Sequence, residues 1–314
     1  MTTAPPAREP VSRRGTHTPG AVEGLLVIDK PPGLTSHDVV ARVRRLADTR
    51  RVGHAGTLDP MATGVLVLGV GRATKLLTYL VGADKTYTAT IRLGVTTLTD
   101  DAEGEVLARA DASVVVPEQV AAGVRELTGT FDQVPSAVSA IKVGGRRAHA
   151  RVRAGEDVEL AARTVTVHRF EVLASEPDVD QGSPVLDLDV EVEVSSGTYV
   201  RALARDLGVG LGVGGHLTSL RRTSVGPYDV AAAHTLDQLA ERLEVLGLAD
   251  AARALFPARE LSAADVATIR FGQHIAATGS GERPVAAFGP DGSLVALLTD
   301  REDHARSLLV LPVD

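Results

Sequence analysis

Asp59 is the carboxylate whose neighbours in the sequence point most clearly to chemistry. It stands in a loop of turn-forming residues, 56–60, which is followed by the apolar run 63–69. A carboxylate held by a turn ahead of a buried strand could act as a nucleophile or as a base. The pattern alone is more typical of a structural turn aspartate, so the residue types leave both interpretations open.

The composition restricts the other kinds of chemistry. The chain contains no cysteine, which excludes disulfides, iron–sulfur clusters, thiolate zinc sites and a thiol nucleophile. The 9 histidines are scattered, with no two within four residues, so the local spacing of a zinc site is missing. We therefore expect no metal and no cofactor, and covalent chemistry from oxygen or nitrogen.

The charge pattern is acidic overall but basic in two places. A net charge of −7 argues against a protein that coats nucleic acid indiscriminately. Local basic groups can nevertheless hold a phosphate backbone, although solvated helix faces would look the same. The two basic groups consist of Arg42, Arg44, Arg45, Arg50 and Arg51, and of Arg146, Arg147, Arg151 and Arg153.

Several segments have the periodicity of strands or helices. Strict alternation over 186–194 predicts an antiparallel strand with one buried and one acidic face. Because strands and helices do not alternate regularly, we expect an α+β fold with a mixed, largely antiparallel sheet flanked by helices. The other expected strands are 24–29, 63–69, 86–93 and 217–221. The expected helices are one through 39–47 that Thr35 or Ser36 can cap, one over 72–80 and a short one carrying Tyr199, Arg201 and Arg205.

Changes in composition and residue pattern along the chain predict three regions. Residues 1–21 are rich in Pro, Thr and Arg without an apolar segment, which favours a disordered tail over a signal peptide. Residues 22–250 form the expected larger domain, to which the family resemblance described below assigns catalysis, and 251–314 form a small domain of short strands and turns. No apolar run reaches the ~18 residues that a membrane span needs. We expect a cytoplasmic protein without a membrane partner.

One glycine pattern resembles a nucleotide-binding fingerprint but lies in the wrong context. Gly210, Gly212 and Gly215 match G-x-G-x-x-G, yet a helical segment precedes them and a strand follows. The fingerprint requires the opposite order. We predict a loop here.

Four ordered motifs carry a resemblance to a known family. They are 53–60 (GHAGTLDP), 24–31 with Thr35 and Ser36, 85–87 (KTY) and 197–201 (GTYVR). Together they resemble the TruB family of tRNA pseudouridine synthases. The resemblance implies the pseudouridine synthase fold, a thumb-like insertion at about 132–158 and a small β-rich, PUA-like RNA-binding domain at 251–314. Ser136 stands where the family usually has Pro, and His149 where it mostly has Tyr.

The resemblance also implies roles for individual residues. Asp59 would be the reacting carboxylate, Arg201 would form a bidentate ion pair with it, and Tyr87 would stack on the target base. These three are the expected catalytic residues. The expected substrate-binding residues are His54, Tyr87, Tyr199, Leu220, Lys30 and Lys142.

The implied reaction is the isomerisation of uridine 55 to pseudouridine in the T-loop of tRNA, after the base flips out of its stack. Glycoside hydrolases commonly use two carboxylates, because the leaving oxygen is protonated and water is activated. Uracil leaves as a delocalised anion and must be kept from water, so one carboxylate is sufficient.

Two other functions share these features: a guide-RNA-dependent relative that acts on ribosomal RNA, and an RNA chaperone without catalysis. The chain ends in Leu311-Pro312-Val313-Asp314 without a Lys-rich extension, which favours an enzyme that needs no guide RNA. The presence of Asp59 favours catalysis over binding alone. We expect a monomer whose partner is the tRNA T-arm.

Overall fold

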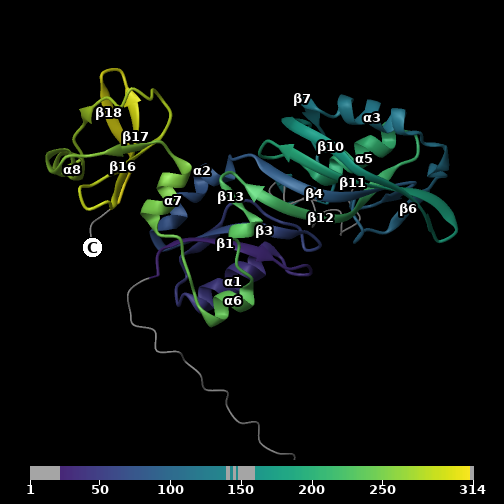
Figure 1. Ribbon diagram of the computed structural model, residues 1–314, viewed down its shortest axis with the longest axis horizontal. Helices are drawn as coiled ribbons and strands as arrows, with labels where there is room; N and C mark the ends of the chain where they lie inside the picture. Colours follow the sequence, from purple (N-terminus) through teal and green to yellow (C-terminus); the bar gives the residue numbers. More distant parts are fainter. Residues whose placement is uncertain (1–21, 139–141, 144–145, 148–159, 312–314) are drawn as a thin grey trace, which may run out of the picture.

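The computed structural model describes residues 22–311 except 139–141, 144–145 and 148–159 (Figure 1). A nine-stranded sheet forms its centre, in the order β1-β3-β12-β4-β11-β10-β7, with β2 paired to β3 and β13 to β12. Only β12 and β3 pair in parallel within it, which confirms the predicted mixed, largely antiparallel sheet. The strands are β1 Gly24–Lys30, β2 Val52–His54, β3 Thr63–Val70, β4 Lys85–Leu93, β7 Gly129–Gln133, β10 Arg163–Asp180, β11 Ser183–Val194, β12 Gly215–Val225 and β13 Tyr228–Asp229.

Helices cover one face of this sheet along most of its width. Their apolar side chains form one cluster with the inward residues of β1, β3, β4, β11 and β12. The cluster includes Leu188, Val190 and Val192, so the alternation seen in the sequence does bury one face of β11. The covering helices are α1 Ser36–Leu46, α3 Pro117–Glu126, α5 Val200–Gly210 and α6 Leu236–Glu241.

Helix α1 shows why its sequence forms a helix at this point. The Thr35 hydroxyl accepts a hydrogen bond from the Asp38 amide at 3.1 Å, and the Asp38 carboxylate accepts one from the Thr35 amide at 2.9 Å. This reciprocal capping satisfies amides that a helix start leaves unpaired. Val39 and Val43 point into the core, and Arg42 remains exposed.

The opposite face of β1 and β3 is covered by two short helices and by α7 (Leu248–Leu255). The sequence predicted one helix over 72–80, but the structure has a 3-10 turn, η1 (Gly71–Lys75), followed by α2 (Leu77–Val81). The turn is tight because its backbone lies on β3: a Cβ at Gly69 would come within 2.9 Å of the Ala73 carbonyl carbon. The single-helix expectation was therefore wrong.

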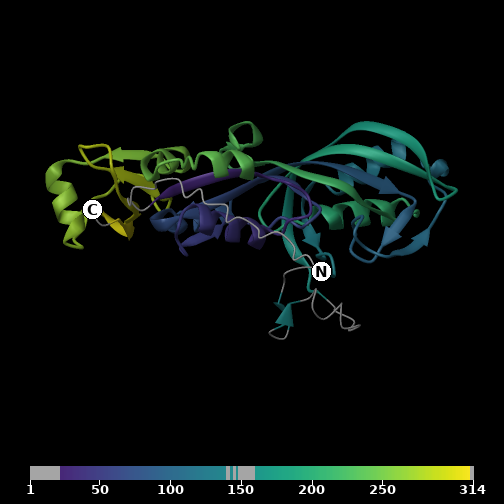
Figure 2. The ribbon, with the colours of Figure 1, turned by 90° about the horizontal axis from the view of Figure 1, so that it is seen from below.

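A second, five-stranded sheet forms the C-terminal part of the chain, in the order β14-β16-β17-β18-β15. Figure 2 shows it at one end of the long axis, with the β10–β11 hairpin at the other. The boundary expected at residue 250 falls inside α7, whose Ala251 and Ala252 are fully buried in an apolar cluster that both parts share. The elements of the C-terminal part are β14 Ala258–Glu260, α8 Ala263–Arg270, β15 Ile275–Ala276, β16 Val285–Phe288, β17 Leu294–Arg301 and β18 His304–Val310.

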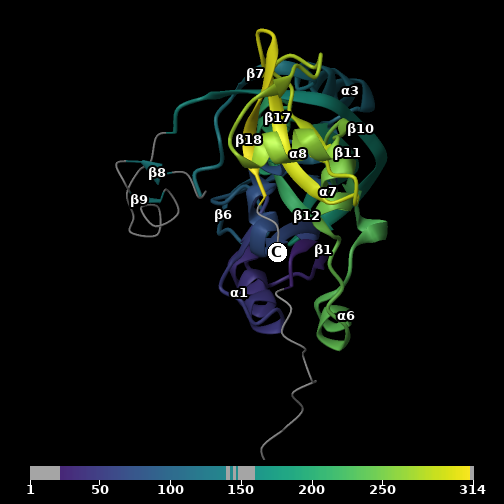
Figure 3. The ribbon, with the colours of Figure 1, turned by 90° about the vertical axis from the view of Figure 1, so that its left-hand side faces the viewer.

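The remaining elements are short. A two-stranded pair, β5 (Val95–Thr97) and β6 (Val106–Arg109), precedes η2 (Ala112–Val114), and η3 (Val230–Ala232) follows β13. Figure 3 shows β8 (Lys142–Val143) and β9 (Arg146–Arg147) standing apart from the main sheet. In the part of the chain that the structure describes, no helix is long and apolar enough to cross a membrane.

Candidate active site

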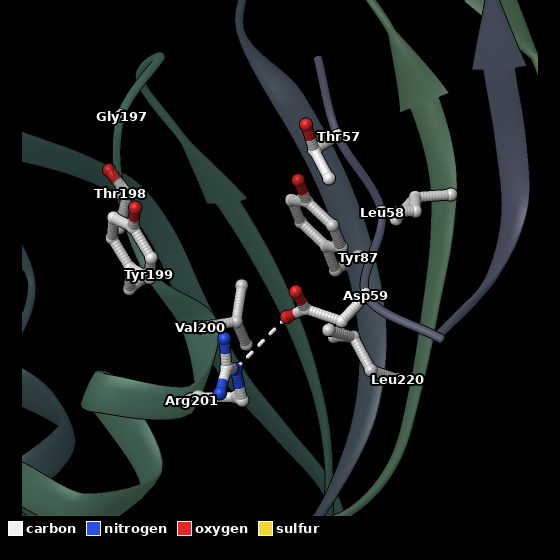
Figure 4. Close-up of a pocket in the computed structure, with 10 residues that line it drawn as sticks. All are labelled: Thr57, Leu58, Asp59, Tyr87, Gly197, Thr198, Tyr199, Val200, Arg201 and Leu220. Atoms are coloured by element: carbon white, nitrogen blue, oxygen red, sulfur yellow. Dashed lines mark ion pairs between the residues drawn. The ribbon is translucent and has the colours of Figure 1, made fainter. Parts of the chain in front are cut away.

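A cavity of about 260 Å³ opens between the loop that follows β2 and the start of α5 (Figure 4). Four segments that are far apart in the sequence form its walls. Five residues that the sequence analysis assigned to one site meet here, namely Asp59, Tyr87, Tyr199, Arg201 and Leu220. The other lining residues are Thr57, Leu58, Gly197, Thr198 and Val200.

Asp59 and Arg201 form an ion pair in this cavity. The Nε atom of Arg201 lies 3.0 Å from Oδ2 of Asp59. The arginine side chain is only 5% exposed whereas the aspartate is 37% exposed, so the carboxylate is open to an incoming group and the guanidinium is not. An ion pair with a buried, rigid guanidinium fixes the direction of the carboxylate.

Only the Nε of the guanidinium faces Asp59 and the two Nη atoms contact other groups, so the bidentate pairing that we expected is not formed. Its Nη1 donates to the Thr99 carbonyl at 2.8 Å and lies 3.2 Å from Oδ2 of Asp101, and its Nη2 donates to the Val138 carbonyl at 3.0 Å. The arginine thus bridges two carboxylates and two main-chain carbonyls. These contacts use the planar fork of donors that lysine lacks.

Asp101 is the site residue that sequence reasoning missed. Its side chain is 4% exposed, and Oδ1 accepts a hydrogen bond from the Glu103 amide at 3.1 Å. The turn that carries it is strained, because Asp100 has a φ of 58° without being glycine. An acidic pair in a Thr-rich turn, 97–101, was the available signal, but only the fold shows that it faces Arg201.

Buried cations hold both ends of the Asp59 loop. On one side, Arg222 donates to the carbonyls of Gly56 at 3.2 Å and Thr57 at 3.4 Å. On the other side, Lys30 Nζ donates to the Pro60 carbonyl at 3.2 Å. Gly56 adopts a φ of 93°, which glycine tolerates without strain. The loop is therefore fixed through its main chain.

Lys30 lies behind the loop and does not line the cavity. Its amine also donates to the carbonyls of Pro31 at 2.9 Å and Leu34 at 2.7 Å. Burial lowers the pKa of Lys30 to about 8, although the negative charge of Asp59 opposes this shift. The amine therefore contacts main-chain carbonyls and does not face the cavity, where we had expected Lys30 to contact the substrate.

The pKa of Lys30 leads to a prediction about stability. Unfolding restores a pKa of 10.5, so between about pH 8 and 10.5 the folded protein binds fewer protons than the unfolded chain. The cost of burying the charge is fully present below pH 8 and is relieved as pH rises, by up to about 1.4 kcal/mol per pH unit. Between pH 7 and 9 we expect the unfolding free energy of the wild type, relative to Lys30→Met, to rise by about 1 kcal/mol.

Urea unfolding of both proteins at the two pH values measures this difference. Titrations of groups that Lys30 does not influence cancel between wild type and variant. A constant difference would show that Lys30 keeps its ordinary pKa in the folded protein.

Of the remaining predicted substrate contacts, His54 does not line the cavity. His54 ends β2, its ring meets that of His37 edge-on at 5.8 Å, and burial lowers its pKa. Its Nδ1 has no hydrogen-bond partner among the described residues.

The side chain of Lys142 lies outside the described part of the chain, as does His149. Within the described ranges, no group of three or more His, Asp or Glu could hold a metal ion.

Comparison with known proteins identifies the family. Residues 44–200 match the N-terminal domain of the TruB family pseudouridylate synthases. A protein of Arthrobacter sp. (strain FB24) called tRNA pseudouridine synthase B is 62% identical over 297 residues, which cover 92% of this chain and 96% of that protein. This chain belongs to the TruB family. It is therefore a pseudouridine synthase, as the resemblance implied.

Other TruB matches extend over residues 201–312. Residues 201–256 match the tRNA pseudouridylate synthase B C-terminal domain, and 256–312 match tRNA Pseudouridine synthase II, C terminal. The protein of the same name from Thermobifida fusca (strain YX) is 56% identical over 288 residues, covering 92% of this chain and 98% of that one.

Solved structures confirm the pseudouridine synthase fold. An H/ACA ribonucleoprotein bound to a substrate RNA containing 2'-deoxyuridine contains a chain with a TM-score of 0.67 and 25% identity, covering 92% of this chain and 85% of that one. A chain of a Cbf5-Nop10-Gar1 complex has a TM-score of 0.67 and 26% identity, covering 92% and 84%.

Proposed function

We propose that this TruB protein converts uridine 55 in the T-loop of tRNA to pseudouridine, with Asp59 as the reacting carboxylate. The observation that carries the proposal is the half-open Asp59 carboxylate, held by Arg201 at the wall of a cavity of about 260 Å³. Small-ligand pockets commonly measure about 300–1,000 Å³, and this cavity lies just below that range, so its size suits a single flipped base. The tRNA substrate is supported by the names of the relatives at 62% and 56% identity.

The reaction breaks the N1–C1′ bond, turns the bound uracil and joins C5 to C1′ before the C5 proton leaves. Asp59 supplies the nucleophilic or basic oxygen, and the buried Arg201 holds that oxygen toward the cavity. The detached uracil must remain in place while it turns. Walls formed by Tyr87, Tyr199 and Leu220 provide apolar surface for this purpose.

Tyr87 is the proposed stacking partner of the base. It lies on β4, lines the same cavity as Asp59, and is 8% exposed (Figure 4). Aromatic rings commonly hold bases that have been flipped out of a helix. In this proposal, Tyr199 and Leu220 complete the pocket, and His54 and Lys142 contact the RNA around the flipped nucleotide.

Affinity for the folded T-arm would come from phosphate contacts. The exposed Arg42 and Arg45 on α1 offer charges for the backbone. We assign the chemistry to residues 22–250 and additional RNA contact to the PUA-like region 251–314. No guide RNA is needed in this proposal, because the T-arm itself presents the uridine.

Tritium release from C5-labelled uridine in an unmodified tRNA transcript tests the proposal. We expect release by the wild type without added metal, cofactor or guide RNA, and none from a transcript that carries cytidine at position 55. Tight tRNA binding without release would contradict the proposed reaction. Release from both transcripts would contradict the proposed position.

A further inference from the structure

Leu58, the residue immediately before Asp59, is held through its main chain by the side chain of Ser36. The Ser36 hydroxyl accepts a hydrogen bond from the Leu58 amide at 2.8 Å and donates one to the Leu58 carbonyl at 3.1 Å. Both residues are buried, with exposures of 1% for Ser36 and 3% for Leu58. One hydroxyl therefore satisfies both main-chain polar groups of the residue that leads into Asp59.

This contact lies between the other anchors of the loop. Arg222 holds the carbonyls of Gly56 and Thr57, and Lys30 holds that of Pro60. The Ser36 contact is adjacent to Asp59 on its N-terminal side. A change at Ser36 thus acts on the segment that sets the direction of the carboxylate.

Ser36 itself cannot move with the loop, because it is the first residue of α1. Reciprocal bonds between Thr35 and Asp38 cap the helix, and Val39 and Val43 bury it in the core. Catalytic groups are placed most accurately when rigid elements support them. A displacement of about 1 Å can cost on the order of 10²-fold in rate.

We propose that Ser36 is a positioning residue for Asp59. Its hydroxyl sets the main chain at Leu58 and so directs the Asp59 carboxylate into the cavity, within 3.0 Å of Arg201. This inference rests on the proposed function, which makes Asp59 the reacting group. It also links α1, whose exposed face carries Arg42, to the catalytic loop.

Ser36→Ala and Thr35→Ala form a matched pair for the test. Both remove a hydroxyl from the start of α1, but among the described residues the Thr35 hydroxyl bonds to Asp38 in the first turn of the helix and not to the Asp59 loop. We would measure the single-turnover rate at saturating tRNA transcript, the dissociation constant and the thermal midpoint. For Ser36→Ala we expect the rate to fall at least about tenfold, which corresponds to ~1.4 kcal/mol in the barrier.

The dissociation constant of Ser36→Ala should stay within about threefold, since phosphate contacts dominate affinity. Thr35→Ala should keep its rate within about twofold, because Val39 and Val43 still hold α1 in the core, even though losing a cap lowers the thermal midpoint. Equal rates for the two variants would overturn the proposal. The proposal would also be overturned if Ser36→Ala had a larger dissociation constant for tRNA but an unchanged rate at saturating tRNA.

Ser36→Cys keeps the test decisive if Ser36→Ala does not fold. A thiol has nearly the same shape but is a weak donor and acceptor, so we expect a rate between those of wild type and a full loss. No disulfide can form within the chain, because it has no other cysteine. A wild-type rate for Ser36→Cys would overturn the proposal. Inactivity of the wild type itself would instead contradict the proposed function.

Discussion

Replacing Asp59 with asparagine is expected to reduce the single-turnover rate at least ~10⁴-fold, or about 5.5 kcal/mol in the barrier. Asparagine keeps the shape of the side chain but removes the anionic oxygen that the proposed reaction uses. The fold should tolerate the change, because Asp101 still pairs with Arg201 at 3.2 Å and Asp59 is 37% exposed. Affinity for tRNA should remain within a few-fold, since phosphate contacts dominate it.

Tritium release and filter binding on the same tRNA transcript measure the two effects separately. Asp29→Asn is a suitable control, because Asp29 is also an ion-paired, partly exposed carboxylate. It pairs with Arg221 at 2.7 Å, on β1 and β12, and does not line the cavity. A parallel loss of rate and affinity in Asp59→Asn would contradict the assignment of Asp59 to chemistry.

Replacing Arg201 with lysine is expected to slow the reaction about 10²-fold, or ~2.7 kcal/mol. Lysine keeps the charge but presents it at one point, so it cannot contact Asp59, Asp101 and the carbonyls of Thr99 and Val138 together. Asp101 is 4% exposed and would lose a well-placed partner. A loss of about 1–3 kcal/mol in unfolding free energy should therefore accompany the slower rate.

Arg205→Lys is the matched control for this variant. Arg205 lies one turn further along α5 and also holds a main-chain carbonyl, that of Val134 at 2.7 Å, together with Asp100 at 3.3 Å. It does not contact Asp59. Urea unfolding and single-turnover rates of both variants separate a loss of stability from a loss of orientation. Equal slowing in the two lysine variants would show that Arg201 contributes no more than helix stability.

Local sequence was sufficient where local forces decide the structure. A helix start at Thr35 or Ser36, the alternation over 186–194 and the turn-forming residues 56–60 can all be recognised from neighbours a few residues away. The family motifs led to the same fold and to the cavity residues Asp59, Tyr87 and Arg201. These motifs are contiguous in the chain, so they can be recognised without knowing what they contact.

Contacts between distant segments were decided only by the tertiary structure. The order of strands brings Arg201 between Asp59 and Asp101, and it places Lys30 behind the loop, where its pKa falls to about 8. Burial and pairing of this kind depend on which elements pack together, and periodicity along the chain does not encode that choice. The same reason hides the bond between Ser36 and Leu58, because the first residue of α1 and the Asp59 loop become partners only when the sheet has formed.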